Sequence, residues 1–451
     1  MGVPPGKNVS RILCYAYKVT GVHLHPEPAL LQAPAITYSK KSIFAPHHYY
    51  TKTHTCMRKT FLLIALAACI SQAGFSQVEL VNKVIGNQSK NAREGFQFTT
   101  LVNAEATPVE NQGASGTCWS YSTNSFLESE MIRNGGPAIH LSPIYTARCA
   151  YMQKAINYVR MHGSVNWGDG GEPHDVVNMY AMYGTLPESD YSGLTHGAKT
   201  NHFSEMMSVI KSMLDAVIKA PNNGVLTPNW QKAVSSVLDS YLGSVPDSFL
   251  YQGKTYTPET FARDVVRLSP DDYVEFISQT STPYWKKAMM MVPDNWAFQH
   301  DWNIPMEDIT TVIDYALKKG YTVAWGTDVS EKYFSWKNGI AYVPQALTTE
   351  MTASQRADLF NGPHPERTIT PEMRQQAFDN YKTTDDHGMQ ITGIAKDQNG
   401  NQWYIVKNSW GVNNDYQGYL YVSKNFVQYK TTSFMVNKGG VPKDILDKLG
   451  S

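Results

Sequence analysis

The sequence predicts an α+β fold in which a helical lobe is followed by a β-rich lobe. Three segments of the first half carry helix start and stop signals, and two segments near the C-terminus carry the signals of a β-hairpin. The 451 residues are 42% hydrophobic and 12% aromatic, which is enough for a large core or for two packed lobes. No internal repeat or Pro- and Gly-rich linker divides residues 77–451, so we expect one domain there.

The predicted helices follow one another closely. Residues 118–133 place apolar side chains on one face before a Gly- and Pro-containing stop. Ser142 before Pro143 is an N-cap followed by proline at the first helical position, and this helix is expected to extend to about residue 162. A third helix is expected over residues 173–183. Together these helices form the predicted helical lobe.

The C-terminal part changes to a strand-like period. Residues 387–395 and 403–408 are predicted strands, and the Asp397–Asn401 segment between them is a strong hairpin signal. With this turn, His387 and Asn408 fall on adjacent antiparallel strands, within a few residues of opposite each other. The sequence therefore brings an imidazole and a carboxamide together.

Cys118 stands at the start of the first predicted helix. The free N–H groups and partial positive charge of a helix N-terminus favour a thiolate, so with a nearby imidazolium we expect the thiol pKa to fall from about 8.5 to well below 7. Peptide cleavage needs an ionised nucleophile, a proton shuttle and hydrogen-bond donors for the carbonyl oxygen. Gln112, Cys118, His387 and Asn408 are residues of the required types.

The segments Gln112–Ser120, Asp386–Gly388 and Lys407–Gly411 resemble the papain-like cysteine peptidase superfamily. The wider pattern resembles its bleomycin hydrolase or aminopeptidase C branch, because Cys118 and His387 are 269 positions apart, against about 130 to 150 in papain. The resemblance implies a papain-like two-lobe fold with a helical insertion at about residues 195–315. Three further segments in or just after this stretch also resemble the branch, namely Asp271–Val274, Val292–Trp296 and Ala324–Glu331, and the match extends from about Asn103 to Val422.

By this resemblance, Cys118 is the nucleophile, His387 is the acid and base, and Asn408 orients the imidazole. Gln112 is an oxyanion donor together with the backbone N–H of Cys118. The alternative for Cys118 is a buried structural thiol, which is the commoner role of an isolated cysteine.

The resemblance also implies three substrate-binding residues. Gly170 and Gly171 would let the substrate backbone lie against the cleft wall, and Trp410 would shield the imidazole and its amide partner from water. Asp169 and Glu172 beside the glycines are candidates to bind a substrate amine, although solvated acids are more usual in a Gly-rich loop.

The predicted function is a cysteine-type peptidase, an aminopeptidase that acts on peptide substrates with no metal or organic cofactor. In the branch, the terminal carboxylate of a C-terminal arm binds the substrate amine, but the ending Val441–Ser451 does not match the usual one. A papain-like endopeptidase, a thiol acyl transferase of the same fold and a binding protein without turnover therefore stay open. The branch also implies a homohexamer.

Residues 1–56 differ from the rest, with six Lys or Arg, one acid and five of the thirteen histidines. From Met57, two basic residues, a short apolar run and small residues before Gln77 resemble a secretory signal, and the run is too short to span a bilayer. We therefore expect residues 1–56 to be upstream translation without ordered structure, residues 57–76 to be a signal peptide, and the 77–451 peptidase domain to be exported to the periplasm or outside the cell. A lipobox-like segment ending at Cys69 leaves a lipoprotein as the alternative.

Residues 77–451 carry 31 Lys and Arg against 38 Asp and Glu, a net charge of −7. This charge gives no support for a nucleic-acid partner. Only Cys118 and Cys149 follow residue 76, which argues against a disulfide scaffold. Cys149, within the second predicted helix, is expected to be a core or surface thiol.

Overall fold

The computed structural model describes Leu80, residues 95–346 and residues 348–450. The described residues belong to one compact unit, Ser71–Ser451. The interpretations of residues 1–56, residues 57–76 and Cys69 lie outside the described residues. No helix in the described part of the chain is long and apolar enough to cross a bilayer.

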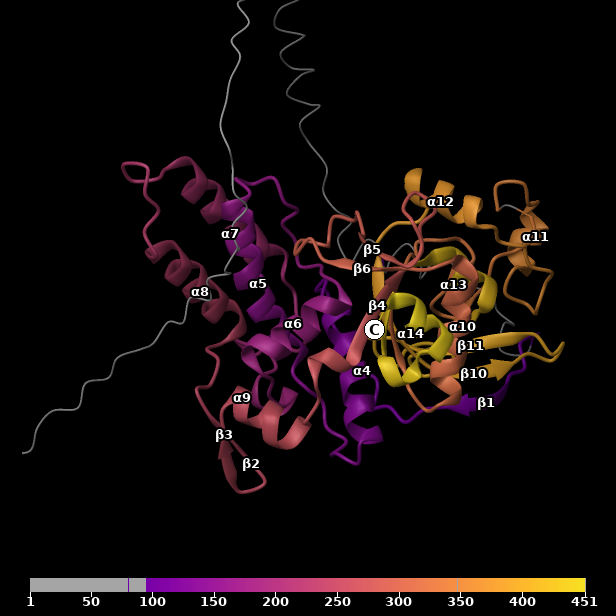
Figure 1. Ribbon diagram of the computed structural model, residues 1–451, viewed down its shortest axis with the longest axis horizontal. Coiled ribbons are helices and arrows are strands. Elements are labelled where there is room, and N and C mark those ends of the chain that lie inside the picture. The colour runs from indigo at the N-terminus through magenta and orange to yellow at the C-terminus, as the bar shows by residue number, and fades with distance from the viewer. Residues whose placement is uncertain (1–79, 81–94, 347, 451) are drawn as a thin grey trace, which may run out of the picture. The chain divides into compact units, whose positions relative to one another are not determined.

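The three predicted helices of the first lobe are confirmed (Figure 1). Ser142 accepts a hydrogen bond from the Tyr145 N–H at 2.9 Å, so it is the N-cap expected before Pro143. Gly184 follows the third helix with a positive φ of 70°, a conformation that suits glycine. The helices are α4 (Cys118–Arg133), α5 (Pro143–Arg160) and α6 (Pro173–Tyr183).

The second lobe is built on a mixed sheet, in which the structure describes eleven strands. Their order is β5-β6-β4-β13-β7-β10-β11-β12-β9-β8, and β1 pairs with β10 as well. The strands are β1 (Thr99–Asn103), β4 (Tyr273–Ile277), β5 (Lys286–Met289), β6 (His300–Asn303), β7 (Val323–Thr327), β8 (Phe334–Ser335), β9 (Ile340–Ala341), β10 (His387–Lys396), β11 (Gln402–Lys407), β12 (Tyr419–Ser423) and β13 (Thr431–Asn437).

The predicted hairpin is formed by β10 and β11. The strands are antiparallel, and Gln390 lies opposite Lys407. His387 is the first residue of β10 and lies opposite Thr327 of β7, while Asn408 directly follows β11. The imidazole and the carboxamide are therefore brought to the same end of two neighbouring strands.

The stretch predicted as a helical insertion, residues 195–315, contains both helices and strands. Its first part packs α7 (Ser204–Lys219) and α8 (Asn229–Leu242) against α5. A small hairpin follows, made of β2 (Phe249–Tyr251) and β3 (Lys254–Tyr256), and then α9 (Pro258–Phe261). The last part supplies β4, β5 and β6 to the main sheet, so only its first half is an addition to the helical lobe.

The helices of the second lobe flank the sheet and extend to the end of the described chain. They are α10 (Met306–Lys318), α11 (Ala353–Asp358), α12 (Pro371–Asp379), α13 (Lys424–Lys430) and α14 (Lys443–Leu449).

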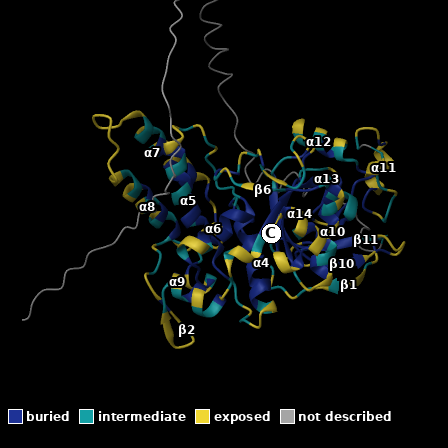
Figure 2. Cartoon of the chain, in the orientation of Figure 1, coloured by how far each residue is buried: buried dark blue, intermediate teal, exposed yellow. Residues whose placement is uncertain are grey.

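Each lobe has its own hydrophobic core, and Figure 2 shows buried residues running through both. One cluster gathers apolar side chains of α4 to α8, and the other gathers those of the sheet with α10, α13 and α14. This division matches the predicted two-lobe α+β fold. Helix α4 is buried on all sides from Cys118 to Met131, so its polar side chains need partners inside the protein.

Candidate active site

Helix α4 is fixed against the sheet by buried polar side chains. Ser125 Oγ donates to Gln390 Oε1 of β10 at 2.7 Å, and Lys407 Nζ of β11 donates to Ser125 Oγ at 2.6 Å. Asn437 Nδ2 of β13 donates to the Glu130 carboxylate at 2.7 Å. Because buried hydrogen bonds are costly to break, these contacts hold Cys118 in a set position relative to β10.

The His387 imidazole is oriented by Asn408. His387 Nε2 and Asn408 Oδ1 are 2.7 Å apart, and the Ser409 backbone N–H donates to the same Oδ1 at 2.7 Å. An oxygen that receives the Ser409 N–H is an acceptor, so His387 Nε2 carries a hydrogen and donates it. The neutral ring then has its free lone pair on Nδ1, which is buried and has no partner in the described part of the chain.

Trp410 covers the other side of this pair. Its ring centroid lies 4.4 Å from that of His387, and it packs edge-on against Trp336 at 5.3 Å. Trp410 was predicted both to shield this contact and to bind substrate, but it is not among the described residues that line the cleft. Burial lowers the pKa of His387 to about 4, although the Asn408 hydrogen bond opposes this shift.

The Cys118 thiol lies at the first residue of α4 and is 8% exposed. Burial raises its pKa to about 12, with the Asp385 and Asp294 carboxylates adding to the shift and a hydrogen bond from the Gly388 backbone opposing it. This direction is opposite to the lowering expected from the helix N-terminus with a nearby imidazolium, because desolvation of the thiol outweighs the helix N-terminus while the imidazole is neutral. A thiolate forms only if its proton passes to a nearby base.

Gln112 joins the loop before α4 to the segment after β11. Its Oε1 accepts from Ser409 Oγ at 2.6 Å, and its Nε2 donates to the Ser115 carbonyl at 2.8 Å. The side chain is fully buried, and one Nε2 hydrogen remains for a second acceptor. Gln112 is not among the described residues that line the cleft holding Cys118, so its predicted oxyanion role stays a prediction.

Cys118 and His387 line one cleft of about 1350 Å³. Its walls come mainly from the start of α4, the loop before α6, residues 291–298 and residues 378–388. No Lys or Arg occurs among its described lining residues, which include six acids: Asp169, Glu172, Asp294, Asp379, Asp385 and Asp386.

Gly170 and Gly171 also line this cleft. A Cβ on Gly170 would lie 1.9 Å from an Asp294 carboxylate oxygen, and a Cβ on Gly171 would lie 2.9 Å from the Trp119 ring. Packing within the protein therefore requires glycine at both positions, whatever they contact in a substrate.

The comparison with known families decides the family of the chain, since residues 65–451 match the Peptidase C1-like family. The chain belongs to this family. The predicted membership in the papain-like cysteine peptidases, in the bleomycin hydrolase and aminopeptidase C branch, is thereby confirmed.

Several members of this Peptidase C1-like branch resemble the chain over most of their length. It is 22% identical to aminopeptidase C of Lactobacillus delbrueckii subsp. lactis over 80% of the chain and 86% of that protein. It is 22% identical to bleomycin hydrolase of Gallus gallus, over 77% of the chain and 84% of that protein. The mitochondrial cysteine proteinase 1 of Saccharomyces cerevisiae is 21% identical, over 78% of the chain and 79% of that protein.

The fold agrees with a solved structure from the same branch. PepW from Lactobacillus rhamnosis HN001 superposes with a TM-score of 0.63 at 18% identity, covering 88% of this chain and 92% of that one. The predicted papain-like fold is therefore confirmed.

The C-terminal helix α14 departs from the arm expected in this branch. Ile445 and Leu449 of α14 are buried in the core beside the sheet, and Lys448 Nζ lies 4.4 Å from the Trp285 ring centroid. None of the described residues beyond Gly388 lines the cleft. The described C-terminal segment thus contributes to the core of the second lobe.

Three cleft acids, Asp294, Asp379 and Asp385, were not predicted from the sequence as cleft residues. Asp385 precedes the catalytic-type motif by one residue, and Asp294 lies in a segment identified only by its resemblance. Asp385 could have been found from its position two residues before His387, because a residue so close to the imidazole in the sequence lies near the substrate. Cys149, in contrast, is a buried core thiol as expected.

Proposed function

We propose that the protein hydrolyses peptide bonds, as an aminopeptidase, through a covalent thioester on Cys118. The observation that carries this proposal is the hydrogen-bonded arrangement of His387, Asn408 and Ser409, which leaves Nδ1 of His387 as the acceptor within the cleft that also holds Cys118. Burial keeps the thiol and the imidazole neutral when each is considered alone.

The reaction begins with proton transfer. His387 Nδ1 takes the Cys118 proton as Sγ bonds to the peptide carbonyl carbon, so the imidazolium arises together with the oxyanion of the tetrahedral intermediate. The Cys118 backbone N–H and the remaining Nε2 hydrogen of Gln112 would stabilise the oxyanion. The imidazolium then protonates the leaving amine as the C–N bond breaks, which leaves an acyl-enzyme.

Water completes the cycle. His387 Nδ1 takes a proton from the water that attacks the thioester, and it returns this proton to Cys118 Sγ as the C–S bond breaks. Throughout these steps Asn408 Oδ1 keeps the ring in place, while Trp410 keeps water from that hydrogen bond.

An endopeptidase is the second candidate, and the position of α14 favours it. The described C-terminal residues do not line the cleft, so they provide no end wall that would restrict cleavage to the first residue of a substrate.

The deciding experiment compares peptides with free and acetylated N-termini. Hydrolysis that requires a free amine supports the aminopeptidase, and equal rates support the endopeptidase. If neither peptide is cleaved while added amines accept an acyl group from an activated ester, the protein is an acyl transferase and the proposal of hydrolysis is wrong.

Export and a homohexamer are further proposals, supported by the signal-like segment at residues 57–76 and by the resemblance to the branch. Cell fractionation with N-terminal sequencing of the mature protein tests the first. Light scattering of the purified protein tests the second, and a monomer mass would contradict it.

A further inference from the structure

Four of the six acids in the cleft are already hydrogen-bonded to neighbouring protein donors. These contacts differ in kind but all occupy a carboxylate oxygen: Gly116 N to Asp169 at 2.5 Å, Asn166 Nδ2 to Asp294 at 2.9 Å, Thr384 Oγ1 to Asp386 at 2.6 Å and Gln375 Nε2 to Asp379 at 2.9 Å. The carboxyls of Glu172 and Asp385 differ from these four, because each has a buried oxygen with no donor among the described residues.

Glu172 and Asp385 present buried oxygens for which the described residues provide no donor. Glu172 is 2% exposed, and one of its oxygens caps α6 by accepting the Asp175 N–H. Glu172 Oε1 and Asp385 Oδ2 are buried and lack a donor among the residues that the structure describes. The two carboxyls are hydrogen-bonded to each other, which requires a proton on one of them, although Glu172 precedes α6 and Asp385 precedes β10.

The cationic side chains near this pair already contact other protein groups. His174 lies between two carboxylates, with Nδ1 3.0 Å from Glu275 and Nε2 3.8 Å from Asp175. Lys154 Nζ donates to the Gly170 carbonyl at 2.9 Å. Asp301 adds a further buried acid next to His174. Acids therefore outnumber cations around the pair, and burial raises the pKa of both Glu172 and Asp385.

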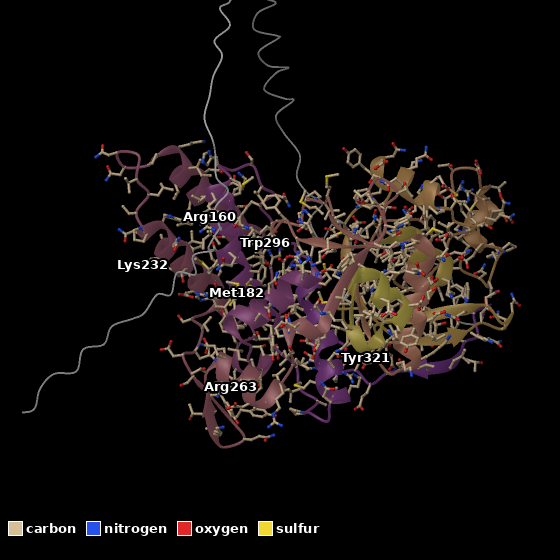
Figure 3. All side chains as sticks on the ribbon, in the orientation of Figure 1. Arg160, Met182, Lys232, Arg263, Trp296 and Tyr321 are labelled. Carbon is tan, nitrogen blue, oxygen red and sulfur yellow. The ribbon has the colours of Figure 1, made fainter. Side chains whose placement is uncertain are left out.

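The acid pair lies close to the reacting thiol. The Asp385 carboxylate is near enough to Cys118 to raise the pKa of the thiol, and Glu172 directly follows the Gly170-Gly171 wall of the cleft. Residues 291–295 also line the cleft, with Asp294 packed next to Gly170, and they lead to Trp296, which Figure 3 labels and which is buried in the core of the helical lobe. A peptide at Cys118 thus lies beside the pair.

We infer that Glu172 and Asp385 form an anionic subsite that binds an ammonium or guanidinium group of the peptide substrate. Such a group donates several hydrogen bonds, and it supplies both the donors and the positive charge that the two carboxyls lack. This inference rests on the proposed peptidase function and adds a preference for cationic substrates. The cation can come from a Lys or Arg side chain or from the free α-amine.

Paired substrates separate these two sources. The side-chain source is tested with acetyl-Lys-Ala and acetyl-norleucine-Ala coumarin amides, which differ in the charged amine at the end of the side chain. The α-amine source is tested with free and acetylated norleucine-Ala amides. If the subsite acts as inferred, kcat/KM favours the cationic member of at least one pair by about tenfold or more.

The matched variants change a carboxyl to an amide of the same shape. In Glu172→Gln the amide oxygen still caps α6, and Asp385→Asn leaves the size of the side chain unchanged. Both changes together should reduce the preference to about twofold or less while hydrolysis of the neutral member continues. Asp379→Asn makes the same chemical change at an exposed residue of the same cleft and should keep the wild-type preference.

The outcomes distinguish this inference from the peptidase proposal. A folded double variant that keeps the wild-type preference overturns the subsite, as does a wild-type enzyme that cleaves both members of each pair equally. Loss of the preference on dialysis against EDTA would mean that the pair binds a metal ion, which also overturns the inference. Failure to cleave any peptide would instead overturn the peptidase function.

Discussion

Two polar clusters face the same cleft, and they differ in how their donors and acceptors are paired. Around His387, donors and acceptors meet: Nε2 donates to Asn408 Oδ1, and the Ser409 N–H donates to the same oxygen, while His387 Nδ1 and Asn408 Nδ2 have no partner within the described residues. At Glu172 and Asp385, like groups meet, and two buried oxygens have no donor within the described residues. The first cluster makes its central hydrogen bonds within the protein, whereas the second has acceptors that a cation from elsewhere can match.

The difference has an energetic basis. Burying a carboxylate without hydrogen-bond donors costs free energy, and burying two of them next to each other costs more. The Glu172 and Asp385 pair is therefore held partly protonated. Proteins tolerate arrangements of this kind mainly where binding or catalysis uses them. The His387 cluster should therefore determine the rate of the reaction, and the acid pair should determine which substrate is used.

The largest expected effect comes from removing the thiol. Cys118→Ala should reduce kcat by a factor of about 10³ or more, because no other group can form the acyl-enzyme. The fold should be retained, since the change removes one sulfur atom. Peptide hydrolysis and circular dichroism measure the two effects. Cys149→Ala, at the buried thiol of α5, is the control and should stay active. Parent-level hydrolysis by Cys118→Ala would refute the mechanism.

A smaller loss is expected at Asn408. Asn408→Ala removes the acceptor of His387 Nε2, so the ring samples unproductive orientations and kcat/KM should fall by about 10- to 100-fold. Asn408→Asp keeps the acceptor and adds negative charge, so it should recover part of the activity and move the acidic limb of the pH profile upward. An equal loss in both variants, with no shift of that limb, would show that Asn408 does not position the imidazole.

The elements that bear the motifs could be predicted because their signals are local. Ser142 with Pro143 marks a helix start, and the Asp397–Asn401 turn fixes the pairing that brings His387 next to Asn408. The sheet beyond this hairpin could not be predicted, since β4 and β13 pair with partners far away in the sequence. The stretch 195–315 was expected to be helical, yet its last part supplies β4, β5 and β6 to the sheet, because pairing with distant strands has no local signature.

The burial and protonation of the cleft residues were harder to predict than the identity of those residues. The low thiol pKa expected for Cys118 rested on the helix N-terminus and a nearby imidazolium, whereas the burial that raises this pKa depends on the whole fold. Glu172 was weighed as a solvated loop acid, yet it is almost fully buried. Its partner Asp385 lies more than two hundred residues away in the sequence, so only the tertiary structure brings the pair together.

The substrate preference should depend on pH. Burial raises the pKa of Asp385 to about 7, with Asp294 and Glu275 adding to this shift and Glu172 and His174 opposing it. Below that pH the carboxyl is protonated, and above it the charge that attracts a cation is present. The preference for the lysine substrate over the norleucine substrate should therefore rise about tenfold between pH 6 and pH 8.

The ratio of kcat/KM for the lysine substrate to kcat/KM for the norleucine substrate removes pH effects that are common to both substrates. His387 has a pKa of about 4 and stays neutral in this range, and its protonation affects both substrates alike. In Asp385→Asn the preference should change less between pH 6 and pH 8, and any remaining change comes from Asp386, another acid of the cleft whose pKa burial raises to about 7. A preference that falls as pH rises would contradict the assigned direction.

The smallest expected effect concerns stability and tests whether the cleft wall is rigid. In Gly170→Ala the added Cβ would lie 1.9 Å from an Asp294 carboxylate oxygen, and Asn166 holds Asp294 in place. The clash should lower stability by about 1–3 kcal/mol, which thermal unfolding reports as a Tm lower by a few degrees. Gly168→Ala is the control in the same loop, because its Cβ would meet only one atom, at 3.9 Å.

If both variants unfold at the parent temperature, the wall moves to accept a side chain, and Asp294 is not fixed next to the thiol. If only Gly170→Ala is destabilised, the acids near Cys118 are held by packing, and a substrate cation must fit the subsite as it stands.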